Sequence, residues 1–435
     1  MTQNDHWPSV VIVGGGFAGI HAAKALAKAP VKVTLIDRKN HHTFQPLLYQ
    51  VALGVLSPAE IASPIRTVLK GAKNVEVLLG QVTGFDLEKR LVKMDDLDLG
   101  YDYLIVATGA THAYFGHPEW ERIAPGLKTI EDATGIRRRV LLAFEVAERE
   151  SIAQGKHRDL VFVVIGAGPT GVELAGAISD ISRRYMEQEF RGIDPRQARV
   201  ILLEGGPRVL PSFPEDLSAS AQRQLTELGV EVRTQAMVTN IEPNQVSVGD
   251  EKIPASVILW GAGVSASSLG KMLGETDRAG RVLVNADLSV PGHAEVFVIG
   301  DLAAAKSKDG TWTPGVAPAA IQMGKFAARQ IRHSVAGQPR ETFSYIDKGT
   351  LATIGRSKAV ADLGKLHFSG YFAWLAWLFV HLLFLIGFRN RFLVMTEWAW
   401  AYITYNNSAR LITDLAPEES TVDSIKQNQK PFSHE

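Results

Sequence analysis

The chain has 435 residues and no cysteine. The absence of thiols excludes structural disulfides, thiolate metal sites and cysteine nucleophiles, and we predict no metal site. Charge of one sign is not in excess either, because 46 lysines and arginines balance 46 acidic residues. A nucleic-acid partner is therefore not expected. No charged and then apolar leader precedes the first apolar run, so we expect no secretory signal and a chain that stays in the cytoplasm.

Glycine, in contrast, is concentrated in two motifs that each follow a short apolar run. Gly14-Gly15-Gly16-Phe17-Ala18-Gly19 follows Val10–Val13, and Gly166-Ala167-Gly168-Pro169-Thr170-Gly171 follows Val161–Ile165. Each motif predicts a strand, a tight turn and a helix whose N-terminus binds a pyrophosphate. The candidate binding residues are Gly14, Gly16, Phe17, Ala18 and Gly19 in the first motif, and Gly166, Gly168, Pro169, Thr170 and Gly171 in the second. Two dinucleotide sites in one chain suggest that one cofactor passes electrons to the other.

An acidic residue ends the next predicted strand after each motif. Asp37 follows Val31–Ile36, about 20 residues beyond the first motif, where a ribose hydroxyl is usually bound. The alternative for Asp37 is a helix-capping residue. Glu204 follows Val200–Leu203 and is expected to bind the adenosine ribose of the second nucleotide. A carboxylate there repels the 2′-phosphate of NADPH and favours NADH, although the neighbouring Arg208 weakens this preference.

The length of the chain predicts two or three domains. We predict an α/β fold with two Rossmann-like domains, in which the second interrupts the first. The first takes residues 1–115 and 285–345, and the second takes 116–284 with its core from about 158. Residues 346–416 form a C-terminal, membrane-associated helical region, and the polar residues 417–435 are expected to be disordered.

The C-terminal region is strongly apolar and aromatic. Phe368–Phe388 has about 21 residues with one histidine and no formal charge, long enough to cross a bilayer. Arg389-Asn390-Arg391 and a second apolar stretch follow, and four of the eight tryptophans lie in the region Phe368–Tyr405. A single transmembrane span and a pair of helices in one leaflet both fit, and His381 favours the pair. A buried core helix or a dimer interface is the third alternative.

Several further runs carry a resemblance to a known family. They are Phe44-Gln45-Pro46-Leu47-Leu48-Tyr49-Gln50-Val51-Ala52, Leu56-Ser57-Pro58, Ile65-Arg66, Thr108-Gly109-Ala110, Gly166–Glu173, Val298-Ile299-Gly300-Asp301, Ala317–Gln322, Asp347-Lys348-Gly349 and Gly387-Phe388-Arg389-Asn390-Arg391. With the first glycine motif, they make the chain resemble the type II NADH dehydrogenases, single-subunit NADH:quinone oxidoreductases of the two-dinucleotide flavoprotein fold. The resemblance covers nearly the whole chain.

The resemblance implies the cofactors and the partners. Non-covalent FAD would occupy the first motif, with Asp37 on its adenosine ribose, Asp301 near a ribityl hydroxyl or the pyrophosphate, and Thr108 and Gly109 along the flavin. Their alternatives are a strand-ending turn for Thr108-Gly109 and a helix cap for Asp301. NADH would occupy the second motif. Electrons would pass to a membrane quinone without proton pumping, at the cytoplasmic face of the inner membrane, from a chain that is a possible homodimer.

The missing cysteines then separate this chain from relatives of the same fold. Disulfide reductases need a redox cysteine pair beside the flavin, and sulfide:quinone reductases need cysteines that carry sulfur. Without thiols, electrons must leave the flavin directly, and the apolar C-terminus indicates a lipid-soluble quinone. Two rivals remain: a flavin reductase with a soluble acceptor, and a redox sensor or scaffold.

The resemblance also implies three catalytic residues. Glu173 would lie at the nicotinamide–flavin–quinone junction and help to protonate the quinone, and its alternative is a first-turn acid favoured by the helix dipole. Gln322 would lie near the quinone ring. Lys348 would stabilise reduced quinone or flavin, and its alternative is a solvated turn lysine. The family's usual glutamine partner of Gln322 is replaced by Pro318, which puts the shape of the quinone site in doubt.

Overall fold

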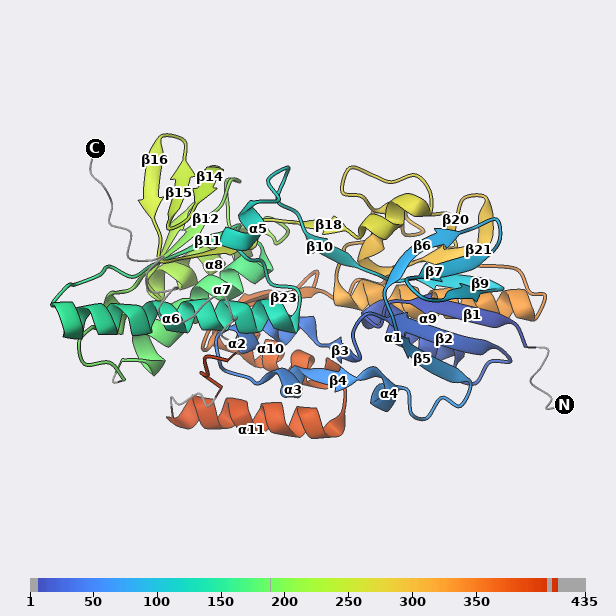
Figure 1. The fold of residues 1–435 in the computed structure, drawn as a ribbon, viewed down its shortest axis with the longest axis horizontal. Helices are drawn as coiled ribbons and strands as arrows, with labels where there is room; N and C mark the ends of the chain where they lie inside the picture. The colour runs from blue at the N-terminus through green and yellow to red at the C-terminus, as the bar shows by residue number, and fades with distance from the viewer. Residues whose placement is uncertain (1–6, 188, 405–408, 414–435) are drawn as a thin grey trace. The chain divides into compact units, whose positions relative to one another are not determined.

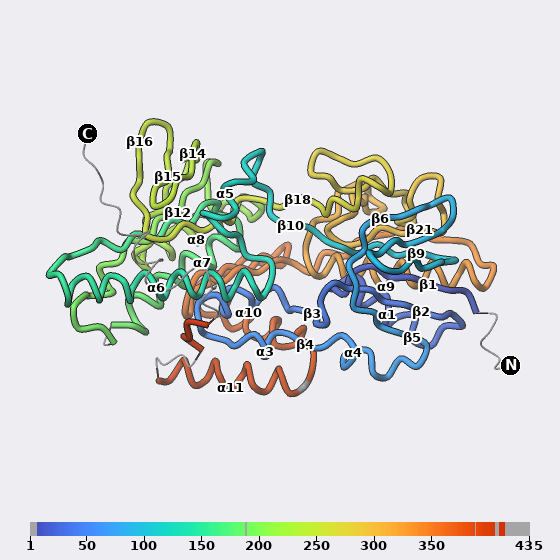
Figure 2. Tube along the Cα trace, viewed as in Figure 1, coloured from blue at the N-terminus to red at the C-terminus, as the bar shows by residue number. Residues whose placement is uncertain are grey.

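The computed structural model describes residues 7–187, 189–404 and 409–413, so the predicted disordered tail at 417–435 lies outside the described residues. The chain packs as two compact units (Figure 1). The first unit takes Met1–Thr43, Ala62–Ala113 and Val264–Lys348, and the second takes Phe44–Ile61, Tyr114–Gly263 and Gly349–Glu435. Figure 2 traces the chain as it leaves and re-enters each unit.

A six-stranded sheet in the order β20-β21-β9-β1-β2-β5 forms the core of the first unit. Its strands are β1 (Ser9–Val13), β2 (Lys32–Asp37), β5 (Val75–Leu79), β9 (Tyr103–Val106), β20 (Ser289–Val290) and β21 (His293–Val298). All its pairs are parallel except β20 with β21. The central strands are continuous apolar runs because a parallel sheet is covered on both faces.

Two helices pack closely against each other beside this sheet. They are α1 (Phe17–Leu26) and α9 (Ala317–Val335). A side chain at Gly324 of α9 would overlap the backbone carbonyl of Ala18 in α1, so glycine permits the close approach. From β1 the chain passes through α1 to β2, whereas β21 lies on the other side of β9, so the strand order reverses between β1 and β9. Such a reversal opens a crevice at the carboxyl ends of the strands.

Smaller elements complete the first unit. They are β3 (His41–Thr43), β4 (Ala62–Pro64), α4 (Ile65–Val68), β6 (Val82–Asp86), β7 (Leu91–Met94), β8 (Asp98–Gly100), β10 (Ala110–His112), β18 (Val264–Ala266), η4 (Ser268–Met272), β19 (Val282–Leu283), η5 (Gly300–Leu302) and β22 (Ala303–Ala304).

The second unit repeats the parallel arrangement in a four-stranded sheet, β13-β12-β11-β17. Its strands are β11 (Val161–Ile165), β12 (Arg199–Leu203), β13 (Val230–Arg233) and β17 (Val257–Trp260). Its helices and small elements include η1 (Gln45–Leu47), α2 (Leu48–Ala52), α3 (Pro58–Ile61), α5 (Trp120–Ile123), α6 (Ile130–Gln154), α7 (Pro169–Asp180), η2 (Ile181–Tyr185), η3 (Pro195–Gln197), α8 (Glu215–Glu227) and the three-stranded sheet β14 (Val238–Glu242), β15 (Gln245–Val248) and β16 (Glu251–Pro254).

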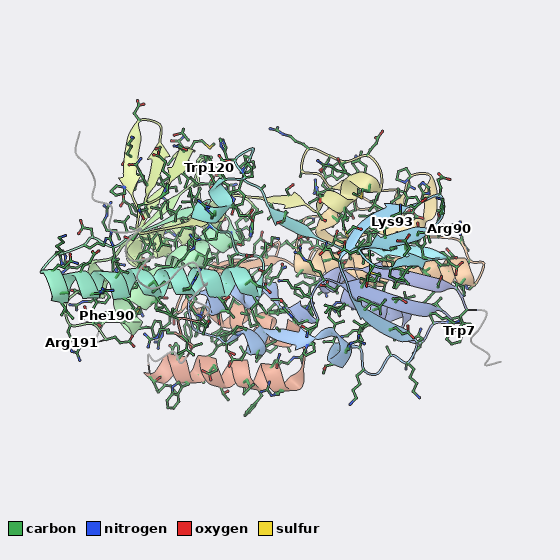
Figure 3. All side chains as sticks on the ribbon, in the orientation of Figure 1. Trp7, Arg90, Lys93, Trp120, Phe190 and Arg191 are labelled. Atoms are coloured by element: carbon green, nitrogen blue, oxygen red, sulfur yellow. The ribbon has the colours of Figure 1, made fainter. Side chains whose placement is uncertain are left out.

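Local sequence signals account for the helices and the core of this unit. The 25-residue helix α6 starts at a capping box, because Thr129 accepts from the Asp132 N–H and Asp132 accepts from the Thr129 N–H. Trp120, labelled in Figure 3, is buried against Trp260 with ring centroids 5.9 Å apart. The contact between these two tryptophans thus stabilises β17, the edge strand that carries Trp260.

The apolar C-terminal stretch does not form one continuous helix. It follows the hairpin β23 (Thr350–Gly355) and β24 (Lys358–Asp362), and its first two residues belong to β25 (His367–Ser369). Helix α10 spans Tyr371–Phe384 and ends where Leu385 becomes extended, and α11 spans Phe388–Thr404. In the described part of the chain, no helix is both long and apolar enough to span a membrane. The apolar stretch therefore contains a pair of helices, as one of the three alternatives predicts, and the position of this pair in a membrane leaflet stays a prediction.

The predicted α/β fold is confirmed. Helix α1 begins at Phe17, directly after the first glycine motif, and α7 begins at Pro169 and changes to a π-helical turn at Ile181. In both helices a glycine, and not a residue with a polar side chain, occupies the N-cap position.

Candidate functional site

The first glycine motif forms a backbone cradle between β1 and α1. Gly14 has a φ of 108°, and a side chain there would overlap the carbonyl oxygen of Ala107. A side chain at Gly19 would overlap the carbonyl oxygen of Gly14, which explains why helix and turn need glycine at both positions. A Cβ at Gly16 would meet no atom within 4 Å, so this position faces open space. Gly14 and Gly19 are therefore packed against the backbone, whereas the space next to Gly16 is free for a ligand.

Asp37, at the end of β2, is fixed at this cradle by two backbone groups. Its Oδ2 accepts from the Gly15 N–H at 2.5 Å, and its Oδ1 accepts from the Lys39 N–H at 2.7 Å. Hydrogen bonds to a carboxylate are among the stronger ones in proteins, so the orientation of Asp37 is set before any ligand arrives.

The second motif repeats this geometry between β11 and α7. Gly166 has a φ of 93°, and a side chain there would overlap the backbone of Ala262. A side chain at Gly171 would overlap the carbonyl oxygen of Gly166, whereas a Cβ at Gly168 would again meet nothing within 4 Å. Pro169 occupies the first turn of α7, where its missing N–H costs no helical hydrogen bond.

Glu204, at the end of β12, makes the same pair of contacts as Asp37. It accepts from the Ala167 N–H and from the Gly206 N–H, both at 2.7 Å. The nearby Arg208 donates to the Pro211 carbonyl at 3.0 Å, and its Nη1 is buried without a hydrogen-bond partner among the described residues.

The geometry of both glycine motifs is suitable for binding dinucleotides. Helices α1 and α7 follow the N-cap residues Gly16 and Gly168, which provide no side-chain cap, and neither helix has an acidic residue in its first turn. Their first N–H groups and their dipoles therefore remain available for an anion. Beyond β9, the hydroxyl of Thr108 is buried and has no partner among the described residues, which suits a polar ligand group.

The remaining candidates of the first unit lie on α9 and the segment that follows it. Gln322 holds the backbone of Ile346, since its amide donates to the carbonyl and accepts from the N–H, both at 2.9 Å. Lys348 is exposed two residues further on. Pro318 lies in the first turn of α9, where proline preserves the helix. Asp301 lies in η5, beside Gly315.

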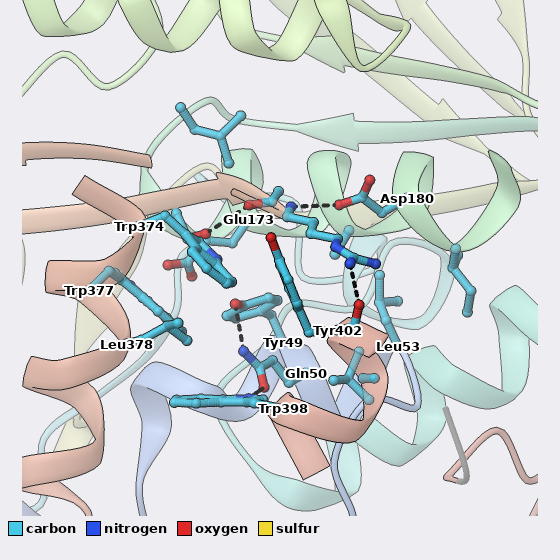
Figure 4. Close-up of a pocket in the computed structure, with 18 of the residues that line it drawn as sticks. Tyr49, Gln50, Leu53, Glu173, Asp180, Trp374, Trp377, Leu378, Trp398 and Tyr402 are labelled. Carbon is cyan, nitrogen blue, oxygen red and sulfur yellow. Dashed lines mark hydrogen bonds between the residues drawn. The ribbon is translucent and has the colours of Figure 1, made fainter. Parts of the chain in front are cut away.

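Glu173 lies in the second unit, where it lines an aromatic pocket. Helix α7 has no acid in its first turn, so the interpretation of Glu173 as a first-turn residue is wrong. Desolvation raises the pKa of the Glu173 carboxyl well above its ordinary value, which favours the protonated form of the side chain. Figure 4 shows Glu173 beside Tyr49 and the tryptophans of the C-terminal helices.

This pocket, which has a cavity of about 110 Å³, joins α2, α7, β23, α10 and α11 of the second unit. Trp398 Nε1 donates to Gln50 Oε1 at 2.7 Å, and Gln50 Nε2 donates to the Tyr49 hydroxyl at 2.8 Å. Arg356 donates its backbone N–H to Asp180 at 2.9 Å, and its guanidinium donates to the carbonyl of Tyr402 and lies over the Tyr402 ring. Tyr49 and Gln50 belong to a run that carries the family resemblance, but the sequence alone predicts no role for them.

Sequence reasoning also missed His42. Its Nδ1 lies 3.0 Å from the Gly15 carbonyl, and its ring packs edge-on against Phe17 at 4.9 Å. Burial lowers the pKa of His42 to about 4, so the ring is neutral at pH 7 and Nδ1 carries the proton that Gly15 accepts. No pattern in the sequence signalled this, because histidines in short strands such as β3 are common and most of them have no special role.

In the described residues, no group of three or more histidine, aspartate and glutamate side chains is arranged to hold a metal ion.

Comparison with known proteins agrees with this architecture. The family model "Pyridine nucleotide-disulphide oxidoreductase" matches residues 8–324, and the chain therefore has the fold of that class, which pairs a flavin with a pyridine nucleotide. The model "NDH2 C-terminal domain" matches residues 348–404.

Two relatives from Mycobacterium tuberculosis narrow the class further. The type II NADH:quinone oxidoreductase NdhA is 46% identical over 91% of this chain and 87% of its own length. The type II NADH:quinone oxidoreductase Ndh is 46% identical over 93% of this chain and 90% of its own length. The chain belongs to the type II NADH:quinone oxidoreductases, and the predicted family and enzyme class are confirmed.

Solved structures agree on the fold. NDH2 from Plasmodium falciparum in complex with NADH superimposes with a TM-score of 0.82 at 20% identity, over 94% of this chain and 100% of that chain. The sulfide:quinone oxidoreductase from Aquifex aeolicus, at 18% identity over 96% of this chain and 95% of its own, superimposes with a TM-score of 0.68.

Proposed function

We propose that the chain transfers two electrons from NADH to a membrane quinone through non-covalent FAD, without pumping protons. One repeated observation carries this proposal. At each of the two glycine motifs a carboxylate, Asp37 or Glu204, accepts hydrogen bonds from two backbone N–H groups. Bound FAD supplies the chemistry that accepts a hydride from a nicotinamide and returns electrons to a quinone. The protein contributes binding and positioning.

We assign FAD to the first unit. Gly14, Gly16 and Gly19, with Phe17 and Ala18 at the start of α1, accommodate its pyrophosphate on the open helix N-terminus. Asp37 holds the adenosine ribose and Asp301 the ribityl or pyrophosphate region. The unpartnered hydroxyl of Thr108 and the backbone of Gly109 line the flavin.

We assign NADH to the second unit. The cradle from Gly166 to Gly171 accommodates the pyrophosphate, and Glu204 binds the adenosine ribose and disfavours a 2′-phosphate. In domain terms, residues 1–115 and 285–345 bind FAD, residues 116–284 bind NADH, and residues 346–416 form the membrane-associated region.

Glu173, Gln322 and Lys348 serve the quinone. Desolvation favours the protonated form of Glu173, which suits a group that gives a proton to a quinone oxygen. Gln322 acts by holding the backbone at Ile346, which orients the segment that carries Lys348. The exposed Lys348 ammonium stabilises negative charge that develops during reduction.

The experiment is anaerobic stopped-flow with NADH, followed by a short-chain quinone. We expect NADH to bleach the bound flavin and quinone to restore it. Glu173→Gln should leave flavin reduction within about twofold and slow quinone-dependent reoxidation by about 10²-fold, the effect of losing a positioned acid.

Glu215→Gln, a change at an exposed acid in the first turn of α8, is the matched control and should change neither step. Wild-type reoxidation in Glu173→Gln would remove Glu173 from the site. A wild-type flavin that NADH does not reduce, or that only a soluble protein acceptor reoxidises, would contradict the proposed function.

We also propose that α10 and α11 lie on the surface of a bilayer. Large apolar side chains are exposed on both helices, including Phe372 at 73%, Phe379 at 63% and Ile403 at 76%. Arg389, at the junction of the helices, is exposed and suits anionic lipid, which is enriched in the cytoplasmic leaflet. The cytoplasmic face of the inner membrane is therefore the proposed location. A second copy of the chain is the alternative partner for these side chains.

A further inference from the structure

The aromatic pocket of the second unit contains a chain of hydrogen bonds whose direction is fixed by chemistry. Indole Nε1 can only donate, so the Gln50 atom that it meets at 2.7 Å must be the amide oxygen. The Gln50 nitrogen is then the atom that meets the Tyr49 hydroxyl at 2.8 Å, and it donates to the phenol oxygen. The two bonds run one way, from Trp398 through Gln50 to Tyr49 (Figure 4).

This direction decides what Tyr49 can offer. Because its oxygen already accepts from Gln50, the phenol proton is left to donate elsewhere, and no acceptor for it is found among the described residues. Tyr49 and Gln50 are both buried, so water does not compete for these bonds. Burial also raises the pKa of Tyr49 well above its ordinary value, and Glu173 adds to the shift, so the proton stays on the phenol.

A second donor in the same cluster has no partner. Trp377, with 1% of its surface exposed, contacts both Tyr49 and Trp398 through its ring, with centroids 6.3 and 5.8 Å away. Its indole N–H is buried and has no hydrogen-bond partner among the described residues. An unpaired buried donor is costly, and it indicates a site that a ligand acceptor completes.

The carboxylate at the other end of the pocket is held by two arginines. Asp180 Oδ2 accepts from the Arg356 N–H at 2.9 Å, and Oδ1, which has no hydrogen-bond partner in the described part of the chain, lies 3.2 Å from the Arg184 guanidinium in an ion pair. The end of the pocket that contains Tyr49 and Trp377 therefore presents unused donors within aromatic walls. A flat ring with carbonyl oxygens and no hydrogen to donate has the complementary pattern.

We infer that this pocket distinguishes the oxidised quinone from its reduced product by the strength of the acceptor, with Tyr49 and Trp377 donating to a quinone carbonyl. Gln50 and Trp398 are positioning residues, because they act only by keeping the Tyr49 proton turned outward. Reduction converts both carbonyls to phenolic hydroxyls, whose oxygens accept hydrogen bonds more weakly and whose protons find no free acceptor beside Tyr49 and Trp377, so the product is bound less tightly. The inference rests on the proposed function, since it assumes that quinone is the acceptor.

The test measures the KM for a short-chain 1,4-benzoquinone and the inhibition constant of the matching quinol, both at saturating NADH. The wild type should bind quinone more tightly than quinol. Tyr49→Phe should raise the quinone KM by about 5- to 10-fold, the value of one hydrogen bond, and leave the quinol constant within twofold. Trp377→Phe should act in the same direction. It breaks no hydrogen bond within the protein, but it removes volume from a buried side chain, so a lower Tm is expected beside the change in quinone KM.

Trp398→Phe tests the positioning role. Without the indole donor, the Gln50 amide can turn its oxygen towards Tyr49 and capture the phenol proton. We expect the quinone KM to rise about threefold in the wild-type background and to stay unchanged when Tyr49→Phe is already present. Gln50→Glu keeps the shape of the side chain but can accept hydrogen bonds from both Trp398 and Tyr49. It should therefore raise the quinone KM as much as Trp398→Phe does, and it provides a second test if Trp398→Phe does not fold.

Trp312→Phe is the matched control, since it removes an exposed indole from the first unit. It should change neither constant, and flavin reduction by NADH should stay at the wild-type rate in every variant. Equal changes in quinone and quinol binding, or additive effects of Tyr49→Phe and Trp398→Phe, would overturn the inference. A wild type that reduces no quinone at all would instead overturn the proposed function.

Discussion

Burial determines the charge state of individual side chains in this protein. His42 is the clearest case, because its ring is 2% exposed and lies between the Gly15 carbonyl and Phe17. Desolvation is the main cause that lowers its pKa to about 4, and the nearby charges of His21 and Lys24 act in the same direction. His42 must therefore stay neutral for the first cradle to keep its shape.

This predicts a loss of stability in mild acid. In the unfolded chain a histidine takes up a proton near pH 6.5, whereas folded His42 does so only near pH 4. The free energy of unfolding should thus fall as the pH drops from 6.5 towards 4, with His42 contributing about 3 kcal/mol at most. His42→Gln, which can still donate to Gly15, should reduce this slope in denaturant titrations.

The slope should not vanish in that variant, because burial also lowers the pKa of His381 to about 4. The exposed His157 supplies the control, and His157→Gln should leave the slope as it is in the wild type. A slope that is the same with and without His42 would show that its ring is already protonated, or open to water, in the folded protein.

At the scale of elements, glycine has two different functions in the two strand–turn–helix motifs. Gly19 and Gly171 allow the helix to pack on its own turn, because any side chain there would overlap a carbonyl oxygen. Gly16 and Gly168 face open space and have ordinary negative φ values, so folding alone does not require them. Their role is to leave room for a ligand.

Two alanine substitutions in the second unit should separate these roles. Gly171→Ala should lower the free energy of unfolding by about 3 kcal/mol, as overpacking does. Gly168→Ala should cost less than about 1 kcal/mol and still raise the KM for NADH about tenfold, because its methyl group would occupy the approach of the pyrophosphate. Thermal unfolding and steady-state kinetics measure the two effects, and equal losses of stability would contradict the distinction.

The elements that can be predicted from the sequence are those that local chemistry determines. The apolar runs before Gly14 and Gly166 define β1 and β11, and the acids at 37 and 204 end the neighbouring strands, so these contacts follow from spacing alone. A pair of helices is among the alternatives predicted for the apolar C-terminus, but the end of α10 at Phe384 could not be predicted, because Leu385 and Ile386 are as apolar as the helix before them. The Trp398–Gln50–Tyr49 chain could not be predicted either, since it joins residues 348 positions apart.

At the scale of the whole molecule, the exposed apolar side chains of α10 and α11 contrast with the even charge balance of the chain. A protein with no net charge has little long-range attraction to a membrane, so binding must come from apolar burial and local arginines. Each exposed phenylalanine that enters a bilayer contributes about 2 kcal/mol.

Vesicle sedimentation tests this arrangement with the full chain. The double change Phe372→Ser and Phe379→Ser should weaken binding to anionic vesicles by at least about tenfold while leaving flavin reduction by NADH unchanged. Leu79→Ser, at an exposed apolar position of the first unit, should have no effect. A wild type that does not sediment with vesicles and forms a stable dimer would assign the apolar side chains to a second copy.

The absence of cysteine makes the two units open to spectroscopic labelling. Any cysteine introduced into this chain is the only thiol present, so a maleimide dye attaches at the chosen position and nowhere else. Leu79 in the first unit and Ile152 in the second are both well exposed, so a single dye that senses its surroundings can be attached to either unit in separate variants. The fluorescence of each unit could then be followed during turnover, with no background of native thiols to remove.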